Sequence, residues 1–477
     1  MCATSGADNL FTDIFNKFSD KAPISIIFRA TLERTINPEF INNLYDDVSQ
    51  KQYTRKLIFS TIFELMNVVV CKIKPSINAA YKENSDNINS SLTAVYDKIN
   101  GVEIGTSQAL VRETSIKMAE VIHSVSGRCE PWIPGYRIKV MDGNCIEATE
   151  HRIDELRDTK SGALPGKSLV IYEPELEMAT DVFPVEDGHA QERSLLDQVL
   201  PTIEKNDVLV MDRNFAVRSF LAGITKQQAY YIVRKHKGLA WSVAGEEKYA
   251  GKDEGNKIYE QLCTIEDDNG VSIKVRRIRI ELKESIRNGE KELVIFTNLS
   301  RSAAPAKLIA EIYRKRWSIE TAFQELEAHL HSEINTLGYP KAALFGFCTA
   351  LIAYNAMAVV KGVLRRVYGE KNIRDNFSVF YMAIHLQMER TGIDMMVEES
   401  EWNIFKNMSI NNFSVFLVEL TEKVNLSHYQ KSKQTKRKNR SKAKKKILML
   451  ATHMSQQHGC CVELHLEITG AQPCLLK

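Results

Sequence analysis

The chain has 477 residues, of which 44% are hydrophobic and 8% aromatic, as in folded globular proteins rather than disordered ones. This length is sufficient for two or three domains. The nine cysteines are scattered and none are paired as C-x-x-C, which excludes a small disulfide-stapled fold and favours a reducing compartment. Because the first residues also lack the layout of a secretory signal, we expect a cytoplasmic protein.

The charge is unevenly distributed along the chain. The net charge is +3, yet ten of the 63 basic residues lie in residues 431–446 (KSKQTKRKNRSKAKKK), which leaves 53 basic against 60 acidic residues elsewhere. Such a run is typical of a disordered, solvated segment, and it also has the charge density that binds nucleic-acid phosphates by counterion release. We therefore expect a disordered basic tail over residues 431–477 whose cations contact nucleic acid, among them Lys436, Arg437 and Lys438.

The first part of the chain has helical patterning. Apolar residues recur at helical spacing in residues 10–18, 55–73, 92–99 and 107–125, with basic residues interspersed. Short helices with interleaved cations suit the binding of duplex DNA, although no specific helix-turn-helix signature is present. We predict a helical N-terminal DNA-binding domain over residues 1–130.

Strand-like and helix-like patterns then follow one another. In chain order they are strands at 137–142, 167–172 and 179–183, a helix at 191–203, a strand at 207–212, a helix at 215–224 and a strand at 229–233. This order predicts a mixed α/β sheet, the first part of a core over residues 131–234.

The remainder of the ordered chain divides into three regions. Residues 235–303 contain alternating polar and apolar runs such as VSIKVRRIRIEL, which predict a β-rich insertion into the α/β core rather than its continuation. A strong helical pattern at 307–331 belongs to the second part of the core, residues 304–366. A helical C-terminal region follows at residues 367–430.

One apolar segment requires a choice between a protein core and a membrane. Residues 342–360 (AALFGFCTALIAYNAMAVV) carry no charge and are long enough to span a bilayer. The segment contains Gly346, Thr349 and Asn355, and it has no second candidate segment beside it. We therefore predict a buried core helix and no membrane partner.

Two aspartates end strand-like runs of the predicted sheet. Asp142 follows RIKVM and Asp212 follows DVLVM, and each precedes a turn. Carboxylates at the C-terminal edge of neighbouring strands face the crevice in which α/β proteins bind ligands, and a close pair of them favours bound cations. Either aspartate alone is also typical of an ordinary turn cap. The pair becomes a strong indication of a two-Mg²⁺ site only with a third feature.

The helix predicted at 307–331 provides that feature. Tyr313, Arg316 and Glu320 are spaced three and then four residues apart, so they share one helical face. A guanidinium one turn from Glu320 would lower the pKa of that carboxylate and could bind a phosphate in bidentate fashion. An ordinary surface ion pair explains the same spacing, and the coincidence of three features is what favours a catalytic site.

These motifs resemble those of a known family. MDGN around Asp142, VLVMDRNF around Asp212 and Y-x-x-R-x-x-x-E from Tyr313 to Glu320 are similar to motifs of the Asp-Asp-Glu transposases of bacterial insertion sequences. They are most like the IS-four branch, which is marked by a Tyr-Arg-Glu-Lys signature and carries a β-rich insertion between the second Asp and the Glu. The resemblance covers residues 137–351.

The resemblance implies an RNase H-like catalytic core and a metal-dependent DNA transposase. By position, Asp142, Asp212 and Glu320 are the ligands of two Mg²⁺ ions, for which Mn²⁺ can substitute. Tyr313 and Arg316 contact DNA near the cut. The implied reaction is nicking at transposon ends, hairpin formation on the opposite strand and strand transfer into target DNA.

The resemblance also implies partners for this chain. They are the terminal inverted repeats and the target DNA, bound by a homodimer in a synaptic complex on the nucleoid of the cytoplasm. Arg213 helps to hold flipped or terminal nucleotides. Trp241 or Tyr249 stacks on a flipped base, although a buried tryptophan in a β domain is the commoner arrangement.

One position departs from the signature of the family. The final lysine falls seven residues after Glu320, where this sequence has Glu327. A carboxylate cannot contact a phosphate as lysine does, so either Lys315 or Lys341 substitutes or the protein is impaired. Two alternatives stay open: a catalytically impaired DNA-binding protein derived from a transposase, and a nuclease that cuts without joining.

Overall fold

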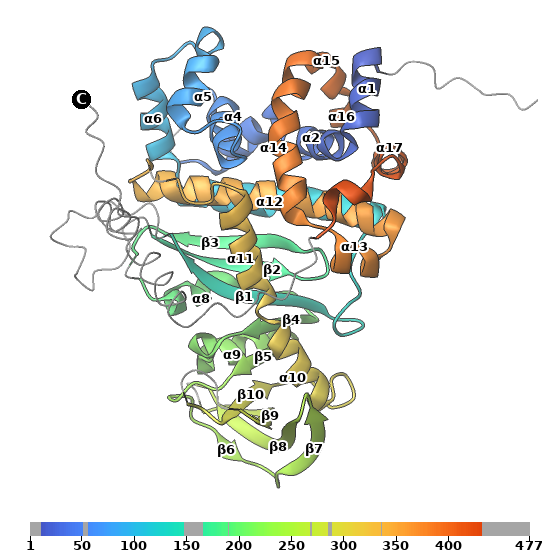
Figure 1. Cartoon of the computed structure of the whole chain (residues 1–477). Coiled ribbons are helices and arrows are strands. Elements are labelled where there is room, and N and C mark those ends of the chain that lie inside the picture. The colour runs from blue at the N-terminus through green and yellow to red at the C-terminus, as the bar shows by residue number, and fades with distance from the viewer. Residues whose placement is uncertain are drawn as a thin grey trace, which may run out of the picture. The chain divides into compact units, whose positions relative to one another are not determined.

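The structure, a computed structural model, describes residues 11–50, 56–146, 166–188, 190–267, 270–284, 289–334 and 336–431. The predictions made for the basic tail, including those for Lys436, Arg437 and Lys438, lie outside these residues. The described residues as far as Gln430 form one compact unit, in which helices from both ends of the chain lie on one side of a large mixed sheet (Figure 1).

Seven α-helices precede the sheet in the described part of the chain. They are α1 (Asp13–Lys21), α2 (Pro23–Thr35), α3 (Pro38–Val48), α4 (Phe59–Val70), α5 (Ile77–Glu83), α6 (Leu92–Gly101) and α7 (Ile104–Ser124). The side chains of Asn37, Ser76 and Ser91 cap α3, α5 and α6 by accepting hydrogen bonds from their first turns. α2 is buried along most of its length, so its sequence lacks the polar face by which a surface helix is found.

The sheet has the strand order β3-β2-β1-β4-β5-β10-β9-β8-β6, with β7 paired to β8. The strands are β1 (Arg137–Cys145), β2 (Lys167–Glu173), β3 (Met178–Val185), β4 (Asp207–Met211), β5 (Tyr230–Arg234), β6 (Ser242–Val243), β7 (Lys248–Asp253), β8 (Asn256–Glu266), β9 (Ser272–Glu281) and β10 (Glu292–Thr297). β1, β2 and β3 are antiparallel neighbours, whereas β4 pairs parallel with both β1 and β5. The predicted mixed α/β sheet is confirmed.

Helices connect and follow these strands. They are α8 (Leu196–Val199), α9 (Arg218–Lys226), α10 (Ala306–Lys315), α11 (Ser318–His329), α12 (Pro340–Tyr368), α13 (Glu370–Asn376), α14 (Val379–Met396), α15 (Glu399–Trp402), α16 (Ile404–Asn407) and α17 (Ile410–Glu422). α14, α16 and α17 pack against α2, so the two ends of the described chain share one helical layer.

Residues 235–303 are β-rich, but the prediction that they do not continue the sheet is wrong. β10 pairs antiparallel with β5, and β9 and β8 follow it in the same sheet. Alternating polarity in the sequence predicts strands with one buried face, but it does not reveal which strand lies at their edge. That pairing is decided by contacts between segments far apart in the chain.

Alternating side chains give the sheet two buried faces. Ile138 and Val140 of β1, like Val210 of β4, belong to a core shared with α7, α10, α11 and α12. Met141 and Met211, one residue further along each strand, belong to a second core with α9. Successive residues of β1 and β4 therefore lie on opposite faces of the sheet.

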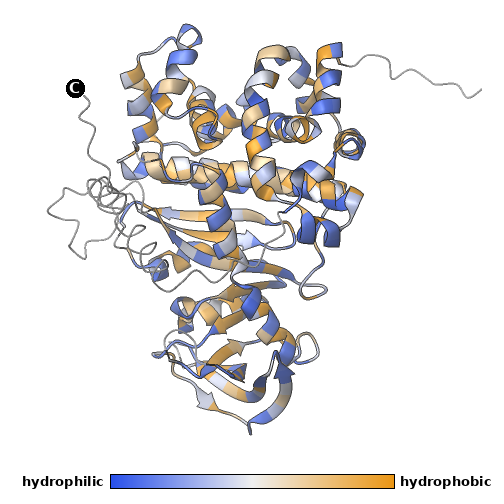
Figure 2. Cartoon of the chain, in the orientation of Figure 1, coloured by the Kyte–Doolittle hydropathy of each residue, from blue (hydrophilic) through white to orange (hydrophobic). Residues whose placement is uncertain are grey.

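The prediction of a buried apolar helix is confirmed by α12. It is long and apolar enough to cross a membrane, and its apolar window is completely buried inside the protein. α12 packs against α2, α4 and α7 and also against β3, so it lies between the helical layer and the sheet (Figure 1). Hydrophobic residues accordingly concentrate along α12 and on the strands, as Figure 2 shows.

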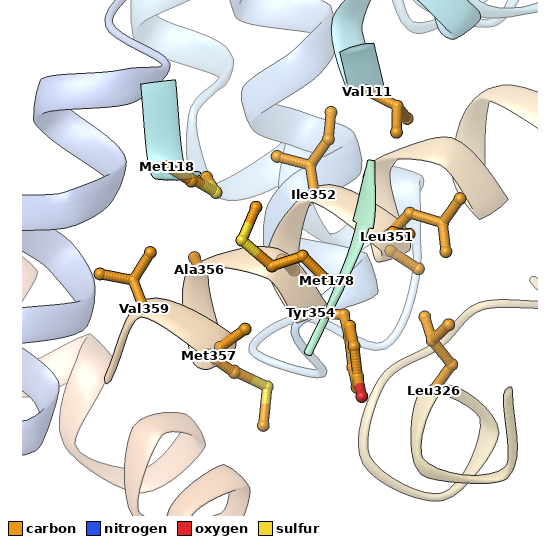
Figure 3. Packing of buried hydrophobic residues seen from close by; sticks show 14 of the residues in the cluster. Val111, Met118, Met178, Leu326, Leu351, Ile352, Tyr354, Ala356, Met357 and Val359 are labelled. Atoms are coloured by element: carbon orange, nitrogen blue, oxygen red, sulfur yellow. The ribbon is translucent and has the colours of Figure 1, made fainter. Parts of the chain in front are cut away.

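The packing around α12 joins elements from the whole described chain. Val111 and Met118 from α7 and Met178 from β3 surround Ile352 and Met357 of α12 (Figure 3). The helix thus contributes to the core through several faces at once, which explains why its sequence is apolar all round.

The amphipathic helix predicted at 191–203 is broken into short pieces. A 3-10 turn (Glu192–Leu195) precedes α8, and a second 3-10 turn (Leu200–Thr202) follows it. Pro201 lacks the backbone N–H that a continuous helix requires at this position. The segment keeps its apolar side on the second face of the sheet, but it does so as a series of turns.

Candidate active site

Asp142 and Asp212 follow the alternation of their strands to the same face of the sheet. Each stands two residues after a buried valine of the face covered by α10 and α11, and the backbone at Asp212 is still extended. The last paired rung between β1 and β4 joins Met141 to Met211. The two aspartates are therefore next in register on parallel strands that lie about 4.8 Å apart.

The strand that carries Asp142 is longer than predicted. β1 continues to Cys145 because β2 pairs with it as far as Lys167, so Asp142 lies within the strand and not at its end. Its Oδ1 accepts a hydrogen bond from the N–H of Gly143 at 3.0 Å. Asp212 does follow the end of its strand, but its side chain makes no capping hydrogen bond to the next turn. A turn cap therefore does not explain Asp212.

The helix predicted to carry the third carboxylate is broken within the motif. α10 ends before Arg316 and α11 begins after Trp317, so Tyr313 and Glu320 do not share one continuous helical face. The break lets α11 cross β1, where the two elements are in contact (Figure 1). Glu320 lies in the first turn of α11, where the helix dipole favours a negative charge.

Arg316 joins two of the three carboxylates. Its Nη1 donates to Asp142 Oδ2 at 2.6 Å and its Nη2 donates to Glu320 Oε1 at 2.7 Å. Arg316 is only 7% exposed. The arrangement is thus a partly buried charge network that reaches from α11 to the sheet, and an ordinary surface ion pair does not describe it.

The charges of this network depend on one another. Burial raises the pKa of Asp142 to about 6, although the Arg316 guanidinium and the Gly143 N–H oppose the rise. The pKa of Arg316 is also raised: burial lowers it, but Asp142, Tyr313 and Glu320 together outweigh the burial. Arg316 therefore keeps its charge, whereas burial outweighs the effect of Arg316 on the charge of Asp142.

Tyr313 completes the group on the side of Asp212. The tyrosine is 9% exposed, and the pKa of its phenol is raised by burial and then by the negative charge of Asp212. The structure thus gathers five predicted residues on one face of the sheet, namely Asp142, Asp212, Tyr313, Arg316 and Glu320.

Arg213, which follows Asp212 directly, is held by a different partner. Its Nη1 lies 3.6 Å from Glu290 Oε1, and Glu290 also pairs with Arg234 of β5. The Arg213 side chain is 37% exposed, so it is accessible at the edge of the site.

Trp241 packs beside an aromatic ring and two cations. Its ring lies 5.8 Å from that of Phe296, and the cations of Lys235 and Arg277 stand over it at 5.5 and 5.2 Å. Tyr249, the other residue predicted for this role, is 57% exposed. Trp241 is partly buried against the core on this face of the sheet, so its role in base stacking stays a prediction.

Two residues near the carboxylates were missed from the sequence. Trp317, in the break between α10 and α11, is 63% exposed and adjoins Arg316. Glu192 lies over Gly143, where a Cβ atom would come within 2.1 Å of its Oε1. A side chain at position 143 would require the flexible carboxylate end of Glu192 to shift, so the glycine in MDGN was the signal for this close approach. Trp317 was overlooked although its spacing, four residues after Tyr313 and three before Glu320, would place it beside both residues on a continuous helix.

Glu327, which stands where the signature has lysine, and the two lysines that could replace it are all accessible to solvent. Glu327 lies on the surface of α11. Lys315 pairs with Glu311 at 2.8 Å and Lys341 with Glu186 at 3.9 Å, and all four side chains are substantially exposed. Exposed pairs of this kind contribute little free energy, so either lysine can leave its partner for a phosphate at small cost.

The donor chemistry of the group fits a divalent cation. Carboxylate oxygens are the ligands that Mg²⁺ prefers, and Asp142 and Glu320 already hold a cation between them in the form of Arg316. As the side chains stand, no three His, Cys, Asp or Glu residues in the described part of the chain are close enough to share a metal ion.

A large groove lies away from this group. It has a volume of about 1440 Å³ between α7 and the sheet, and its lining includes Arg112, Arg137 and Glu204. Arg137 is the first residue of β1, and the strand runs from there toward Asp142. The groove therefore lies at the opposite end of β1 from the carboxylates.

Comparison with known proteins gives matches over the region that contains these residues. A family model described as "Transposase DDE domain" matches residues 133–356. Similar proteins include the putative transposase InsL for insertion sequence element IS186A of Escherichia coli strain K12 and the transposase for insertion sequence element IS421 of Escherichia coli. Each is 24% identical over 244 residues, which cover 44% of this chain and 62% of the relative. The match thus spans less than two thirds of the relatives' length.

One solved structure aligns over most of the chain at a low score. It is the cryo-EM structure of a piggyBac transposase synaptic complex with hairpin DNA, with 8% identity and a TM-score of 0.32 over 85% of this chain and 81% of the other. So low a score carries no argument about fold or function.

Proposed function

We propose that this chain, whose residues 133–356 form a transposase DDE domain, cuts DNA at the ends of a mobile element and joins those ends to target DNA. The predicted resemblance to bacterial insertion-sequence transposases of the Asp-Asp-Glu type is confirmed. The observation that carries the proposal is the convergence of Asp142 and Asp212 on the face of the sheet where Arg316 holds Glu320.

The catalytic core in this proposal is RNase H-like. The order β3-β2-β1-β4-β5, with β1 to β3 antiparallel and β4 and β5 parallel to β1, supports it. Residues 131–234 and 304–366 supply this core. Residues 1–130 would bind DNA. Residues 235–303 would form the β-rich insertion, and residues 367–430 would form the helical C-terminal region.

The carboxylates of Asp142, Asp212 and Glu320 would hold two Mg²⁺ ions, for which Mn²⁺ can substitute. When bound, such ions polarise the scissile phosphate and activate a water molecule or a 3′-hydroxyl as the nucleophile. The chain itself contributes the positions of the ligands. The parallel strands place the two aspartates in register. α11, which contacts β1, supplies Glu320 from the second part of the core.

Residues around the carboxylates are suited to DNA. Arg316 and Tyr313 would contact the phosphates beside the cut, and Arg213 would hold the terminal nucleotides at the accessible edge of the site. Trp317 exposes a large aromatic face next to Arg316, on which a base can stack.

The remaining parts of the proposal concern the assembly. The partners would be the terminal inverted repeats and target DNA, held by a homodimer. The complex would lie on the nucleoid in the cytoplasm. The basic run 431–446 would contact DNA phosphates. The reaction would proceed from a nick through a hairpin on the opposite strand to strand transfer.

The proposed metal ligands can be tested by single substitutions. Asp142→Asn, Asp212→Asn and Glu320→Gln should each reduce cleavage of a labelled transposon-end duplex in Mg²⁺ by more than about 100-fold, because each removes a ligand oxygen. Each should leave binding of the same duplex intact in a gel-shift assay. Near-normal cutting by one of these variants would contradict the metal role of that residue.

The products of the wild-type reaction separate the alternatives. Nicks followed by hairpins and joined strands support the proposal. Nicks alone would favour a nuclease, and binding of the duplex without any cleavage would favour an impaired DNA-binding protein, as Glu327 in place of the signature lysine allows.

A further inference from the structure

We propose that Arg316 occupies the place of a metal ion in the DNA-free protein, so that metal binding at Asp142 and Glu320 is coupled to the arrival of DNA. The inference rests on the proposed function, since it assigns these carboxylates to a metal. It adds a positioning role for Arg316 before any substrate is present. The protein would then assemble its metal site only on DNA.

The first step of the argument is geometric. The two nitrogen atoms of the Arg316 fork bind one oxygen of each carboxylate, at 2.6 Å from Asp142 and 2.7 Å from Glu320. A divalent cation held between the same two carboxylates would occupy the space that the guanidinium fills, and two cations would repel each other there. The guanidinium and the metal ion therefore exclude each other from this position. In agreement, no metal-binding cluster exists among the described side chains in their present arrangement.

The second step concerns charge. Two carboxylates brought together at a partly buried site repel each other unless a cation lies between them. Arg316 supplies that cation, since it donates hydrogen bonds to both carboxylates. Arg316 thus stabilises the arrangement of ligands before the metal is bound, and for the same reason it competes with the metal.

The third step is the exchange itself. Arg316 Nε is buried and has no hydrogen-bond partner among the described residues, so the guanidinium uses only part of its donor capacity in this state. A phosphate offers the planar fork two acceptor oxygens and a full negative charge. Transfer of Arg316 from the carboxylates to a DNA phosphate would satisfy the side chain and release both carboxylates to the metal.

The experiment measures metal binding without DNA and without catalysis. Mn²⁺ is titrated into the full-length protein, and the free ion is followed by electron paramagnetic resonance. The wild-type protein should bind Mn²⁺ weakly, and Arg316→Gln should bind it at least about tenfold more tightly, equivalent to about 1.4 kcal/mol. Arg316→Lys should lie between them, because one ammonium group cannot form the bidentate bridge.

A matched control removes the same charge from the neighbouring turn. Arg314 pairs with Asp253 and Glu254 at 2.8 and 2.7 Å, away from the carboxylates. Arg314→Gln should leave the Mn²⁺ affinity unchanged. Adding Asp142→Asn to Arg316→Gln should abolish the gain, which places the bound ion at this carboxylate.

Folding is followed in parallel, because loss of Arg316 leaves a partly buried carboxylate without its cation. Addition of Mn²⁺ should raise the melting temperature of Arg316→Gln more than that of the wild-type protein. If Arg316→Gln does not fold, Arg316→Lys carries the same comparison. Equal Mn²⁺ affinity in the wild-type protein and in the Arg316 variants would overturn the inference.

A last titration distinguishes failure of the proposed coupling between metal and DNA from failure of the proposed function. A duplex carrying the terminal inverted repeat should raise the Mn²⁺ affinity of the wild-type protein to that of Arg316→Gln. If the wild-type protein binds Mn²⁺ equally with and without the duplex, and Asp142→Asn abolishes this binding, the metal site stands and the coupling is wrong. If no Mn²⁺ binds at Asp142 even with the duplex, both the proposed function and the inference fail.

Discussion

At the residue scale, the carboxyl group of Asp142 is subject to two opposed effects. Burial disfavours its charge and raises its pKa to about 6, whereas the guanidinium of Arg316 and the N–H of Gly143 favour the charge. Burial is the larger effect. The carboxyl group of Asp142 therefore lies where a neutral group is favoured, and such perturbed groups are common at functional sites.

This balance predicts a dependence of stability on pH. Between the reference pKa of 3.8 and the folded value of about 6, the folded protein keeps a proton that the unfolded chain has lost. The free energy of unfolding should therefore fall as the pH rises through this window, by about 3 kcal/mol in total for this group. Asp142→Asn should remove the fall, so that the variant is more stable than the wild-type protein at pH 8 and equal to it near pH 4.

The measurement is urea unfolding of the metal-free protein at several pH values. Asp375→Asn, which removes an exposed carboxylate from α13, controls for the change of net charge. A wild-type protein and an Asp142→Asn variant with parallel pH profiles would contradict the prediction.

At the element scale, α12 is tied to the sheet by a polar side chain as well as by apolar contacts. Asn355 is completely buried; its Oδ1 accepts from the N–H of Ala179 at 2.9 Å and its Nδ2 donates to the carbonyl of Ala179 at 2.7 Å. Ala179 lies in β3, the last strand at that end of the sheet. The amide thus takes the place of a further strand and satisfies an edge that would otherwise be buried unpaired.

Asn355→Leu should therefore destabilise the protein although it makes the core more apolar. It leaves the N–H and carbonyl of Ala179 without partners, at a cost of about 2–4 kcal/mol in the free energy of unfolding. Thr349→Val is the matched control on the same helix, because the Thr349 hydroxyl bonds only to the carbonyl of Phe345 in its own helix. Denaturant unfolding should show a much smaller loss for this control, and equal losses would refute the edge-capping role.

At the scale of the whole molecule, the helical layer and the sheet share one core. α7 packs on both α12 and β3, and α4 packs on α12. Side chains of residues 1–130 such as Val111 and Met118 therefore share their core with later parts of the chain (Figure 3). The function of this region in DNA binding remains a prediction, and its stability depends on the rest of the unit.

A fragment of residues 1–130 should consequently fail to fold alone. Without α12 and β3 its buried apolar surface would be exposed to water, which costs about 25 cal/mol per Å². Circular dichroism should show no cooperative melting for the fragment, whereas the chain to residue 430 should melt in a single transition. A fragment that melts cooperatively at the same temperature as the longer chain would show that the two parts have separate cores.

The sequence alone predicted those elements whose pattern of apolar residues lies within one short segment. The apolar run at 342–360 predicts a buried helix because a helix surrounded by protein needs apolar residues on all sides. The strand patterns predict β1 and β4 and place Asp142 and Asp212 at the end of neighbouring strand-like runs, because an apolar run of strand length is a local signal. The motif spacing also brought together Tyr313, Arg316 and Glu320, although as one helical face.

Features that depend on contacts between distant segments required the tertiary structure. Pairing with β2 extends β1 beyond Asp142, and pairing of β10 with β5 joins residues 235–303 to the sheet. Neither pairing could be predicted, because the sequence of one strand does not show which strand it pairs with. The break between α10 and α11 and the contact of α11 with β1 were not visible in the helical pattern. The bridge of Arg316 to Asp142 joins residues 174 positions apart, so the sequence alone could not reveal it.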